Sequence, residues 1–476
     1  MELAIDFYKS ASGGYENSLT EGHKKNNGVF YTDVPLADKM FCAIKKYLPA
    51  NPVIVDPCCG LGVFLITANK YGFTNTYGID IDKKAIDFCA VNIPQSKFIA
   101  FDFFGAETED VLARLSITEK ADCIIGNPPY VPLSGKVTLN GQNAFRRQVS
   151  EMGNNLFVAA ILRSLTLLKD GGVLSYIIPK NFLHVSSYTK LRRELLRNYT
   201  ILSIVDIDSY FKSVRGEQII ITIKNKKPRK NQNKIQIRGY IANHFTNLCS
   251  VFQSFYSDVI LLFDCEQDRK IYEQLANNYK TFDDCNNGYV CRGKSTAHGA
   301  VAGKNIRKFG YKEESIPNDD GSQIFIQNIY SAEAGIIAAF GGTLEASETV
   351  TIFNDCDPKM CRFILGILHS RLCNFFLYKY CYNSSRLTMH TDAKYLRKIP
   401  LPIHGNDDFG NFFTEILPIV AELENDEYLT QKWFDDMERL NKAVYKIYKL
   451  DDEISKYIDK EIQKVQSKRW YGVRRN

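Results

Sequence analysis

Four consecutive residues, Asn127-Pro128-Pro129-Tyr130, carry groups that can act on a planar amine. The lone pair of such an amine is drawn into its ring, so methyl transfer to the nitrogen requires acceptors that return electron density to it. The Asn127 side-chain oxygen and the Pro128 carbonyl can each accept one N–H. The prolines stiffen the turn, and Tyr130 offers an aromatic face to a base that has left its helix. A proline turn that only closes a buried strand is the alternative.

The elements that would hold this turn follow an alternating pattern. From residue 52 onward, short β-branched runs alternate with helical stretches, which predicts a wound α/β domain with a parallel sheet. The expected strands are 53–55, 76–79, 98–100, 123–125 and 173–178. Polar residues follow the first four strands, namely Asp56, Asp80, Asp102 and Asn127. Because ligands bind beyond the carboxyl ends of strands in an open sheet, we expect these four residues to line one crevice.

The side chains at the first three strand ends fit S-adenosylmethionine. Gly60 and its neighbours let the backbone approach the amino-acid part of this cofactor closely. Asp80 can accept both ribose hydroxyls, and Asp102 can accept from the adenine amine while a neighbouring phenylalanine packs on the ring. A helix cap for Asp80 and a strand-terminal turn for Asp102 are the alternatives. The expected contacts are Asp56, Pro57, Cys59, Gly60, Gly62, Asp80, Ile81, Asp102 and Phe103.

The composition is that of a globular protein with more than one domain. At 476 residues the chain exceeds one ordinary domain, and its 45% apolar and 12% aromatic residues allow large cores. The net charge of +6 permits nucleic-acid binding without arguing for it. Thirteen cysteines without a CxxC pair, and no signal peptide, predict reduced thiols in the cytoplasm. We expect neither a metal site nor a membrane span, because no metal-ligand cluster is found and the longest apolar runs have strand length.

Several sequence blocks together resemble the γ-type adenine-N6 DNA methyltransferases, the TaqI-like group. The resemblance covers about residues 24–225. This sequence departs from the pattern of the group at Asp33, where proline is common, and at Cys58, where alanine is frequent. The matching blocks are Gly28–Pro35, Val55–Leu65, Asp80, Asp102, Asn127–Tyr130, Asn155–Phe157, Leu167–Leu174, Ile178–Pro179 and Phe211 ahead of 218–223.

The resemblance implies an α/β, Rossmann-like S-adenosylmethionine-dependent methyltransferase domain followed by a mixed α+β target-recognition domain. Tyr31 and Thr32 of the opening block would close over the cofactor, and Asn127 would contact it as well. Phe211 would place a second aromatic ring against a flipped adenine, unless it is an ordinary core residue. The implied reaction is site-specific methylation of adenine N6 in DNA by direct transfer. No cysteine follows the prolines to attack a ring carbon, as a cytosine-C5 reaction would require.

The second half would select the substrate. The basic, proline-broken stretch 224–234 indicates a loop near a domain boundary, which either steers DNA or is simply solvated. The helix expected at 363–376 and the proline exit at 396–402 resemble parts of the recognition domains of the same group. The expected regions are an N-terminal arm at 1–27, a catalytic domain at 28–238, a DNA target-recognition domain at 239–408 and a helical region at 409–476.

Basic residues in three segments are candidates for DNA contact. Two of them lie in a polar loop expected at 131–153, beside the proline turn, where they can touch backbone phosphates. The others lie in the glycine-rich strand-turn 287–296 and in the polar segment 378–394. Ordinary solvated loops have much the same composition. The candidates are Arg146, Arg147, Arg292, Lys294, Arg386, His390 and Lys394.

The expected partner is double-stranded DNA, with a separate restriction endonuclease or the subunits of a defence system as further partners. No nuclease signature precedes residue 28, so we do not expect a fused cutting domain, and we expect a monomer.

Three alternative functions stay open. A glutamine or ribosomal-RNA methyltransferase uses the same turn but usually lacks a large second half, and cytosine N4 is a target on the same logic. A non-catalytic DNA-binding subunit is the third, although intact Asn127, Asp80 and Tyr130 argue against it.

Overall fold

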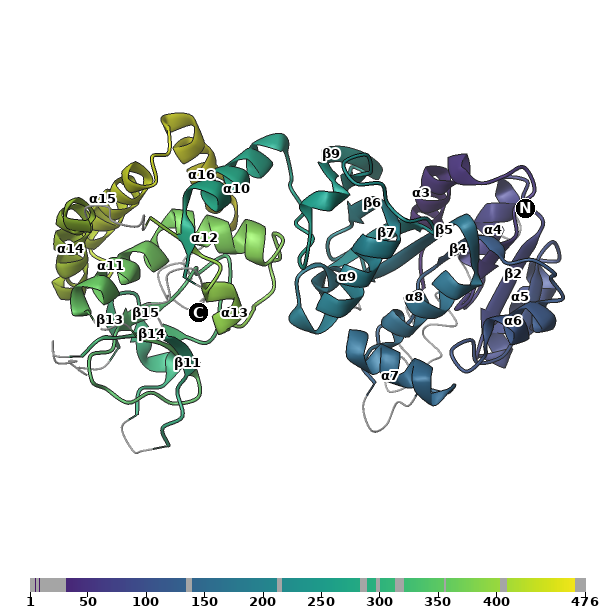
Figure 1. Cartoon of the computed structure of the whole chain (residues 1–476), viewed down its shortest axis with the longest axis horizontal. Coiled ribbons are helices and arrows are strands. Elements are labelled where there is room, and N and C mark those ends of the chain that lie inside the picture. The colour runs from purple at the N-terminus through teal and green to yellow at the C-terminus, as the bar shows by residue number, and fades with distance from the viewer. Residues whose placement is uncertain are drawn as a thin grey trace. The chain divides into compact units, whose positions relative to one another are not determined.

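In the computed structural model, the chain divides between Cys265 and Glu266 into two units, which are described separately below (Figure 1). Most of the N-terminal arm expected at 1–27, and Gly28–Phe30 of the opening block, lie outside the described residues. The described residues are 5, 8, 31–133, 139–211, 216–282, 289–296, 300–312, 321–354, 357–402 and 409–466.

Within the described part of the first unit, nine strands form one sheet in the order β3-β2-β1-β4-β5-β7-β6-β8-β9. β1 to β5 are joined by parallel pairing, whereas β7 runs antiparallel to both β5 and β6. The five strands predicted from the alternating runs are β1 to β5, so the predicted parallel sheet is confirmed. The strands are β1 (Ile54–Asp56), β2 (Thr76–Asp80), β3 (Lys97–Ala100), β4 (Ala121–Gly126), β5 (Leu168–Pro179), β6 (Thr200–Asp206), β7 (Gln218–Lys224), β8 (Lys234–Ile241) and β9 (His244–Phe252).

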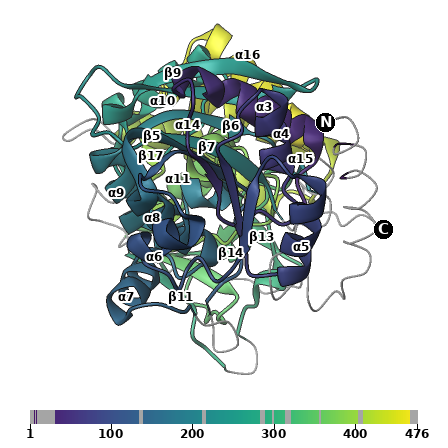
Figure 2. The same cartoon turned by 90° about the vertical axis from the view of Figure 1, so that its right-hand side faces the viewer.

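Helices cover both faces of this sheet, which is why its central strands are apolar on both sides. Figure 2 shows α3, α4 and α5 on one side and α6, α8 and α9 on the other. On the first side, Phe41 of α3, Phe64 of α4 and Ile177 of β5 belong to one buried core. The helices are α3 (Val34–Ile44), α4 (Val63–Lys70), α5 (Lys83–Asn92), α6 (Thr108–Leu115), α7 (Asn143–Met152), α8 (Leu156–Leu167) and α9 (Thr189–Asn198).

The polar loop predicted over 131–153 is wrong in its second half, most of which is helix α7. Phe145 and Val149 are one helical turn apart, and the surrounding alanine, arginine, glutamine and glutamate residues favour a helix. Gly153 ends it with a φ of 145°, which suits glycine. Residues 134–138 of this stretch lie outside the described residues.

The basic stretch 224–234 connects two strands of the same sheet, β7 and β8. β8 pairs antiparallel with β9, and its alternate residues Ile235 and Ile237 are buried. The boundary expected after residue 238 therefore falls inside β8. The assignment of catalytic and recognition roles to the stretches 28–238, 239–408 and 409–476 stays a prediction.

The second unit combines small antiparallel sheets with helices (Figure 1). Its largest described sheet has the order β11-β16-β14-β15. The strands are β10 (Lys280–Thr281), β11 (Tyr289–Arg292), β12 (Ile306–Arg307), β13 (Gly310–Tyr311), β14 (Gln323–Gln327), β15 (Ala338–Phe340), β16 (Val350–Asn354) and β17 (Pro400–Leu401). The helices are α10 (Glu266–Asn278), α11 (Pro358–His369), α12 (Arg371–Phe376), α13 (Ala393–Leu396), α14 (Phe409–Asn425), α15 (Gln431–Ile447) and α16 (Asp452–Val465).

The single helix predicted over 363–376 is wrong, since Ser370 divides it into α11 and α12. Ser370 has extended backbone angles, and its hydroxyl accepts a hydrogen bond from the Cys373 amide, 3.1 Å away. A serine that caps a new helix in this way ends the preceding one. The helical region predicted near the end of the chain is confirmed by α14, α15 and α16.

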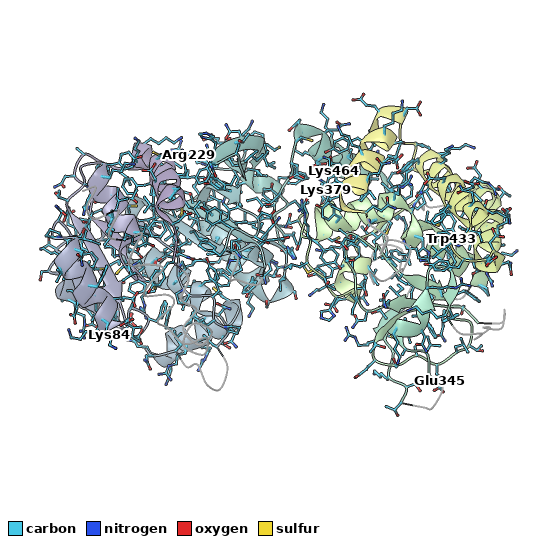
Figure 3. All side chains as sticks on the ribbon, turned by 180° about the vertical axis from the view of Figure 1, so that it is seen from behind. Lys84, Arg229, Glu345, Lys379, Trp433 and Lys464 are labelled. Atoms are coloured by element: carbon cyan, nitrogen blue, oxygen red, sulfur yellow. The ribbon has the colours of Figure 1, made fainter. Side chains whose placement is uncertain are left out.

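A buried ion-pair network joins three helices of the second unit. Lys379 Nζ lies 2.9 Å from Glu461 Oε2 of α16 and 3.6 Å from Asp268 Oδ2 of α10. Lys464 also pairs with Glu461, and Figure 3 labels both lysines.

Among the described residues, no single helix is long and apolar enough to cross a membrane. The two helical segments Pro358–His369 and Arg371–Cys381, which meet at a bend of 60°, are long and apolar enough only when they are taken together.

Candidate active site

The ends of β1 and β2 are joined by hydrogen bonds through the glycine loop that follows β1. The Cys59 amide donates to the Ile79 carbonyl over 2.9 Å, and the Gly60 amide donates to Asp80 Oδ2 over 2.8 Å. Gly60 and Gly62 have φ values of 51° and 77°, in the region that favours glycine. A Cβ on Gly62 would lie 2.6 Å from the Ile93 side chain, so this position is closed to larger residues as well. The loop therefore holds the backbone close against the end of β2.

Asp56 at the end of β1 is buried and faces the end of β4. Its Oδ1 accepts from the Cys58 amide over 3.2 Å, and a Cβ built on Gly126 would lie 2.7 Å from the same oxygen. Within the described residues, its buried Oδ2 has no hydrogen-bond partner. Burial raises the pKa of this carboxyl well above its ordinary value. A buried carboxylate oxygen with spare acceptor capacity, next to open glycine backbone, fits the ammonium group of S-adenosylmethionine.

Asp80 is held at the end of β2 by backbone donors. Besides the Gly60 amide, the Asp82 amide donates to Asp80 Oδ1 over 3.0 Å. Burial raises the pKa of Asp80 in spite of these donors. Ile81 beside it is 71% exposed, an unusual position for an isoleucine. An acidic acceptor next to an open apolar side chain suits the ribose and adenine of a nucleoside.

Asp102 follows β3 and is engaged in a local turn. Its Oδ1 accepts from the amides of Phe104 and Gly105, and its Oδ2 accepts from Asn140 Nδ2 over 2.8 Å. Phe103 is buried at 3% exposure, and Phe104 next to it is partly exposed. The Asn140 amide therefore occupies one acceptor position of the carboxylate that is predicted to bind the adenine amine of the cofactor.

The proline turn follows β4 and is tied to the opening block. Asn127 Nδ2 donates to Thr32 Oγ1 over 3.3 Å, and Asn127 Oδ1 accepts from the Tyr130 hydroxyl. The Tyr8 hydroxyl donates to the Thr32 carbonyl over 2.5 Å. Pro128 is buried, whereas the side chains of Asn127 and Tyr130 are partly exposed. Two different partners thus orient the Asn127 amide, with its oxygen toward the Tyr130 hydroxyl.

The other residues of the opening block contact two further parts of this site. The Tyr31 ring lies against the glycine loop, because a Cβ on Gly60 would be 3.0 Å from Tyr31 Cε1. Asp33 Oδ1 caps helix α3 through the Leu36 amide, and its Oδ2 accepts from the Tyr210 hydroxyl over 2.6 Å.

Phe211 is 8% exposed and belongs to the buried core of the first unit. Tyr31, Tyr130 and Tyr210 pack against the same core, and the rings of Tyr210 and Phe211 meet edge to face at 5.4 Å. Phe211 thus shares a core with these aromatic residues and packs directly on Tyr210. Its role as a base platform stays a prediction.

A buried charge cluster that was not predicted from the sequence joins the ends of β5 and β6 to the start of β7. Lys180, which directly follows β5, places Nζ 2.7 Å from Asp206 Oδ2 at the end of β6 and 3.9 Å from Glu217 Oε2 just before β7. Its backbone amide also donates to the Glu217 carbonyl. Burial opposes the ammonium form, yet the two carboxylates raise the pKa of Lys180. The signal available in the sequence was a charged residue directly after β5, at the end of β6 and directly before β7.

The basic candidates occupy two places, one in each unit. Arg146 and Arg147 are exposed on helix α7 of the first unit. In the second unit, Arg292 donates to Asn328 Oδ1 over 2.9 Å and to Asp392 Oδ1 over 3.3 Å.

Two more candidates join Arg292 around the same residues. His390 Nδ1 lies 3.3 Å from the Asn328 carbonyl, and Lys394 Nζ lies 3.5 Å from Asp392 Oδ2. The structure thus brings together Arg292, His390 and Lys394, which the sequence selected from separate segments. Lys294 and Arg386 are also exposed.

Comparison with known proteins relates the chain to restriction-modification enzymes. Residues 94–211, which include the proline turn, match the family described as Eco57I restriction-modification methylase. Type II methyltransferase M.VspI of Vibrio sp. (strain 343) is 29% identical over 274 residues, which is 55% of this chain and 63% of that protein. Modification methylase CviBIII of Paramecium bursaria Chlorella virus NC1A is 26% identical over 246 residues, 51% of this chain and 60% of that protein. The chain thus spans less than two thirds of these relatives.

Two solved structures share the fold at low sequence identity. The type IIL restriction-modification enzyme MmeI, in complex with DNA, has a TM-score of 0.50 at 12% identity over 95% of this chain and 81% of that one. The DrdV–DNA complex has a TM-score of 0.52 at 10% identity over 90% of this chain and 60% of that one. Residues 94–211 are thus similar to the methylase domain of Eco57I restriction-modification methylases, and the topology of the first sheet is that of an α/β methyltransferase fold.

Proposed function

We propose that the protein is a site-specific DNA methyltransferase that uses S-adenosylmethionine to methylate adenine N6. The observation that carries the proposal is the orientation of the Asn127 amide by Thr32 and Tyr130 at the carboxyl end of β4. The matches to restriction-modification methylases support DNA as the substrate.

Each group of the turn has a separate task in this proposal. The Asn127 side-chain oxygen has two lone pairs, so it can accept an adenine N–H while the Tyr130 hydroxyl occupies the other. The Pro128 carbonyl accepts the second N–H and thereby draws the nitrogen toward tetrahedral geometry. Tyr130 stacks on the flipped base with its ring. Most of the rate enhancement then comes from positioning and electrostatics rather than from proton abstraction.

The cofactor would lie over the ends of β1 and β2. Asp56 Oδ2 would accept from its ammonium group, Asp80 from its ribose hydroxyls, and Ile81 would pack on its adenine ring. Bound S-adenosylmethionine would supply a methyl group on a sulfonium. As the neutral amine forms the new N–C bond, the S–C bond breaks, a neutral thioether leaves, and one amine proton passes to solvent. Asp102 Oδ2 would accept from the cofactor's adenine amine with the lone pair that its bond to Asn140 leaves free.

DNA would be held by basic residues of both units. Arg146 and Arg147 on α7 would contact backbone phosphates, whereas the group of Arg292, His390 and Lys394 would contact phosphates or base edges. Lys294 and Arg386 are further candidates for phosphate contact.

The test is transfer of label from radioactive S-adenosylmethionine to unmodified DNA, with RNA and protein as parallel substrates. Wild-type protein should label DNA. Asn127→Ala should bind the cofactor within about threefold of wild type and lose at least about 100-fold in methyl transfer, because it lacks one of the two acceptors. Near-normal transfer by Asn127→Ala would contradict the proposed role of the turn. Label in RNA or protein alone would indicate a different substrate, and DNA binding without transfer would indicate a non-catalytic subunit.

A further inference from the structure

The opening block of the methylase domain touches three parts of the candidate site within three consecutive residues. Tyr31 lies against Gly60 of the cofactor loop, and Thr32 accepts from Asn127 of the catalytic turn. Asp33 accepts from Tyr210, which is 177 positions away in the chain. The third contact is the least expected from the family resemblance, since proline is common at the position of Asp33 and offers no such acceptor.

Asp33 has one oxygen for each of two tasks. Its Oδ1 accepts from the Leu36 amide and caps α3, so the block is anchored to that helix. Its Oδ2 takes the Tyr210 hydroxyl. Burial and this bond raise the pKa of Tyr210, so the hydroxyl keeps its proton and remains a donor at physiological pH.

Tyr210 is held from its other sides as well. Its ring packs edge to face on Phe211 at 5.4 Å and on Tyr240 at 5.6 Å. Just before it in the chain, Asp206 is bound to the buried Lys180. With β6 held at its end by Lys180 and Tyr210 held by Asp33, the position of the neighbouring Phe211 depends on the opening block.

We infer that Asp33 and Tyr210 form a latch that couples the segment covering the cofactor to the aromatic group around Phe211. The inference rests on the proposed function, because it assigns cofactor and base to the two sides of the latch. Both residues are positioning residues, since neither is assigned a contact with the reacting atoms. When the latch is closed, Tyr31 stays against the cofactor loop, Thr32 stays bonded to Asn127 of the catalytic turn, and Phe211 keeps its place next to Tyr210.

The latch can be opened without removing the helix cap. Asp33→Ser retains a side chain that caps helices but lacks the second arm toward Tyr210. Tyr210→Phe removes only the hydroxyl. Asp33→Asn keeps the cap, and its amide nitrogen can donate to the Tyr210 oxygen, so it should restore the bond with reversed polarity. Tyr71→Phe is the matched control, because Tyr71 also donates to an aspartate of helix α3, Asp38, over 3.1 Å.

The first readout is the rate at which radiolabelled S-adenosylmethionine leaves the full-length protein in a filter-binding chase. We expect Asp33→Ser and Tyr210→Phe to release it about five- to tenfold faster than wild type, and the double variant to release it no faster than either single variant. Asp33→Asn should recover most of the wild-type rate, and Tyr71→Phe should stay within about twofold of it. The melting temperatures of all variants check that they remain folded.

The second readout is single-turnover methylation of unmodified DNA at saturating cofactor, which should slow by a similar factor in the two latch variants. The latch would be overturned if Asp33→Ser and Tyr210→Phe both kept the wild-type rates of release and methylation. It would also be overturned if their effects on the release rate added up in the double variant. If wild type methylates no DNA but the chase still separates the variants as expected, the latch stands and the proposed reaction fails.

Discussion

Thr32 and Asn127 are 95 positions apart in the chain, yet Asn127 Nδ2 donates to Thr32 Oγ1 over 3.3 Å. This bond lets a segment expected to cover the cofactor also orient the amide expected to hold the substrate. The Thr32 and Tyr130 hydroxyls thus hold the Asn127 amide from two sides, with Nδ2 toward Thr32 and Oδ1 toward Tyr130. The geometry is therefore prepared before any base enters.

Thr32→Val should separate the orientation of the Asn127 amide from the binding of the cofactor. The valine side chain has nearly the same shape and Thr32 is 3% exposed, so the main loss is the acceptor for Asn127. We expect kcat for DNA methylation to fall about tenfold, which corresponds to roughly 1.4 kcal/mol, while cofactor affinity changes less than threefold. Thr67→Val is the control, since Thr67 is equally buried but donates only to the Val63 carbonyl of its own helix. Equal effects of the two changes would argue against the orienting bond.

Cofactor affinity should depend on pH through Asp80. Burial raises its pKa, so it takes up a proton at a higher pH than an ordinary aspartate. The charged form accepts hydrogen bonds better, so affinity should be full above this pKa and should fall as the pH drops through it. We expect isothermal titration at pH 8 and below to show this loss, and Asp80→Asn to bind weakly at all pH values. Asp87→Asn, at an exposed aspartate of α5 that pairs with Lys83, should retain the wild-type profile.

The basic group of the second unit should contribute to DNA affinity. Replacing Arg292, His390 and Lys394 together with alanine should weaken binding of unmodified duplex DNA about 10- to 100-fold at moderate salt and reduce the dependence of affinity on salt. Fluorescence anisotropy measures both. Arg439→Ala is the control, because Arg439 is an exposed cation of the same unit that pairs with Glu422 and Asp436. An unchanged affinity in the triple variant would place the DNA surface elsewhere.

Lys308 should lower the stability of the second unit near neutral pH. Burial lowers its pKa to about 7, whereas an unfolded lysine has a pKa of about 10.4. Between these values the unfolded chain binds a proton that the folded chain does not, so the free energy of unfolding should rise as the pH increases from 7 toward 10.

The substitution Lys308→Met should abolish this rise and stabilise the protein at pH 7, by an amount on the order of 2–4 kcal/mol. Denaturant unfolding followed by tryptophan fluorescence suits the measurement, because Trp433 is fully buried in the same unit (Figure 3). The exposed Lys304, replaced by methionine, is the control. A slope that persists in Lys308→Met would assign the pH dependence to other groups.

The first sheet was predictable because its signals are local. Apolar runs that end in Asp56, Asp80, Asp102 and Asn127 report both the strands and the edge at which a ligand binds. Helix α7 was missed because its polar composition resembles a loop, and only the spacing of Phe145 and Val149 distinguishes it.

Contacts between distant segments were not predictable from one chain. Nothing near Asp33 indicates that Tyr210 would reach it, and the bonds of Lys180 depend on the order in which β5, β7 and β6 pair. In the second unit, Arg292, His390 and Lys394 were selected by charge alone. Their convergence on Asn328 and Asp392 follows only from the packing of that unit.

The central claim is that the protein methylates the exocyclic amine of adenine in DNA, and that the proline turn holds this amine. The most direct measurement is mass spectrometry of nucleosides from unmodified DNA after incubation with the protein and S-adenosylmethionine. The account predicts N6-methyladenine with wild-type protein and none above background with Asn127→Ala. N4-methylcytosine as the product, or no methylated nucleoside despite measurable cofactor binding, would contradict it.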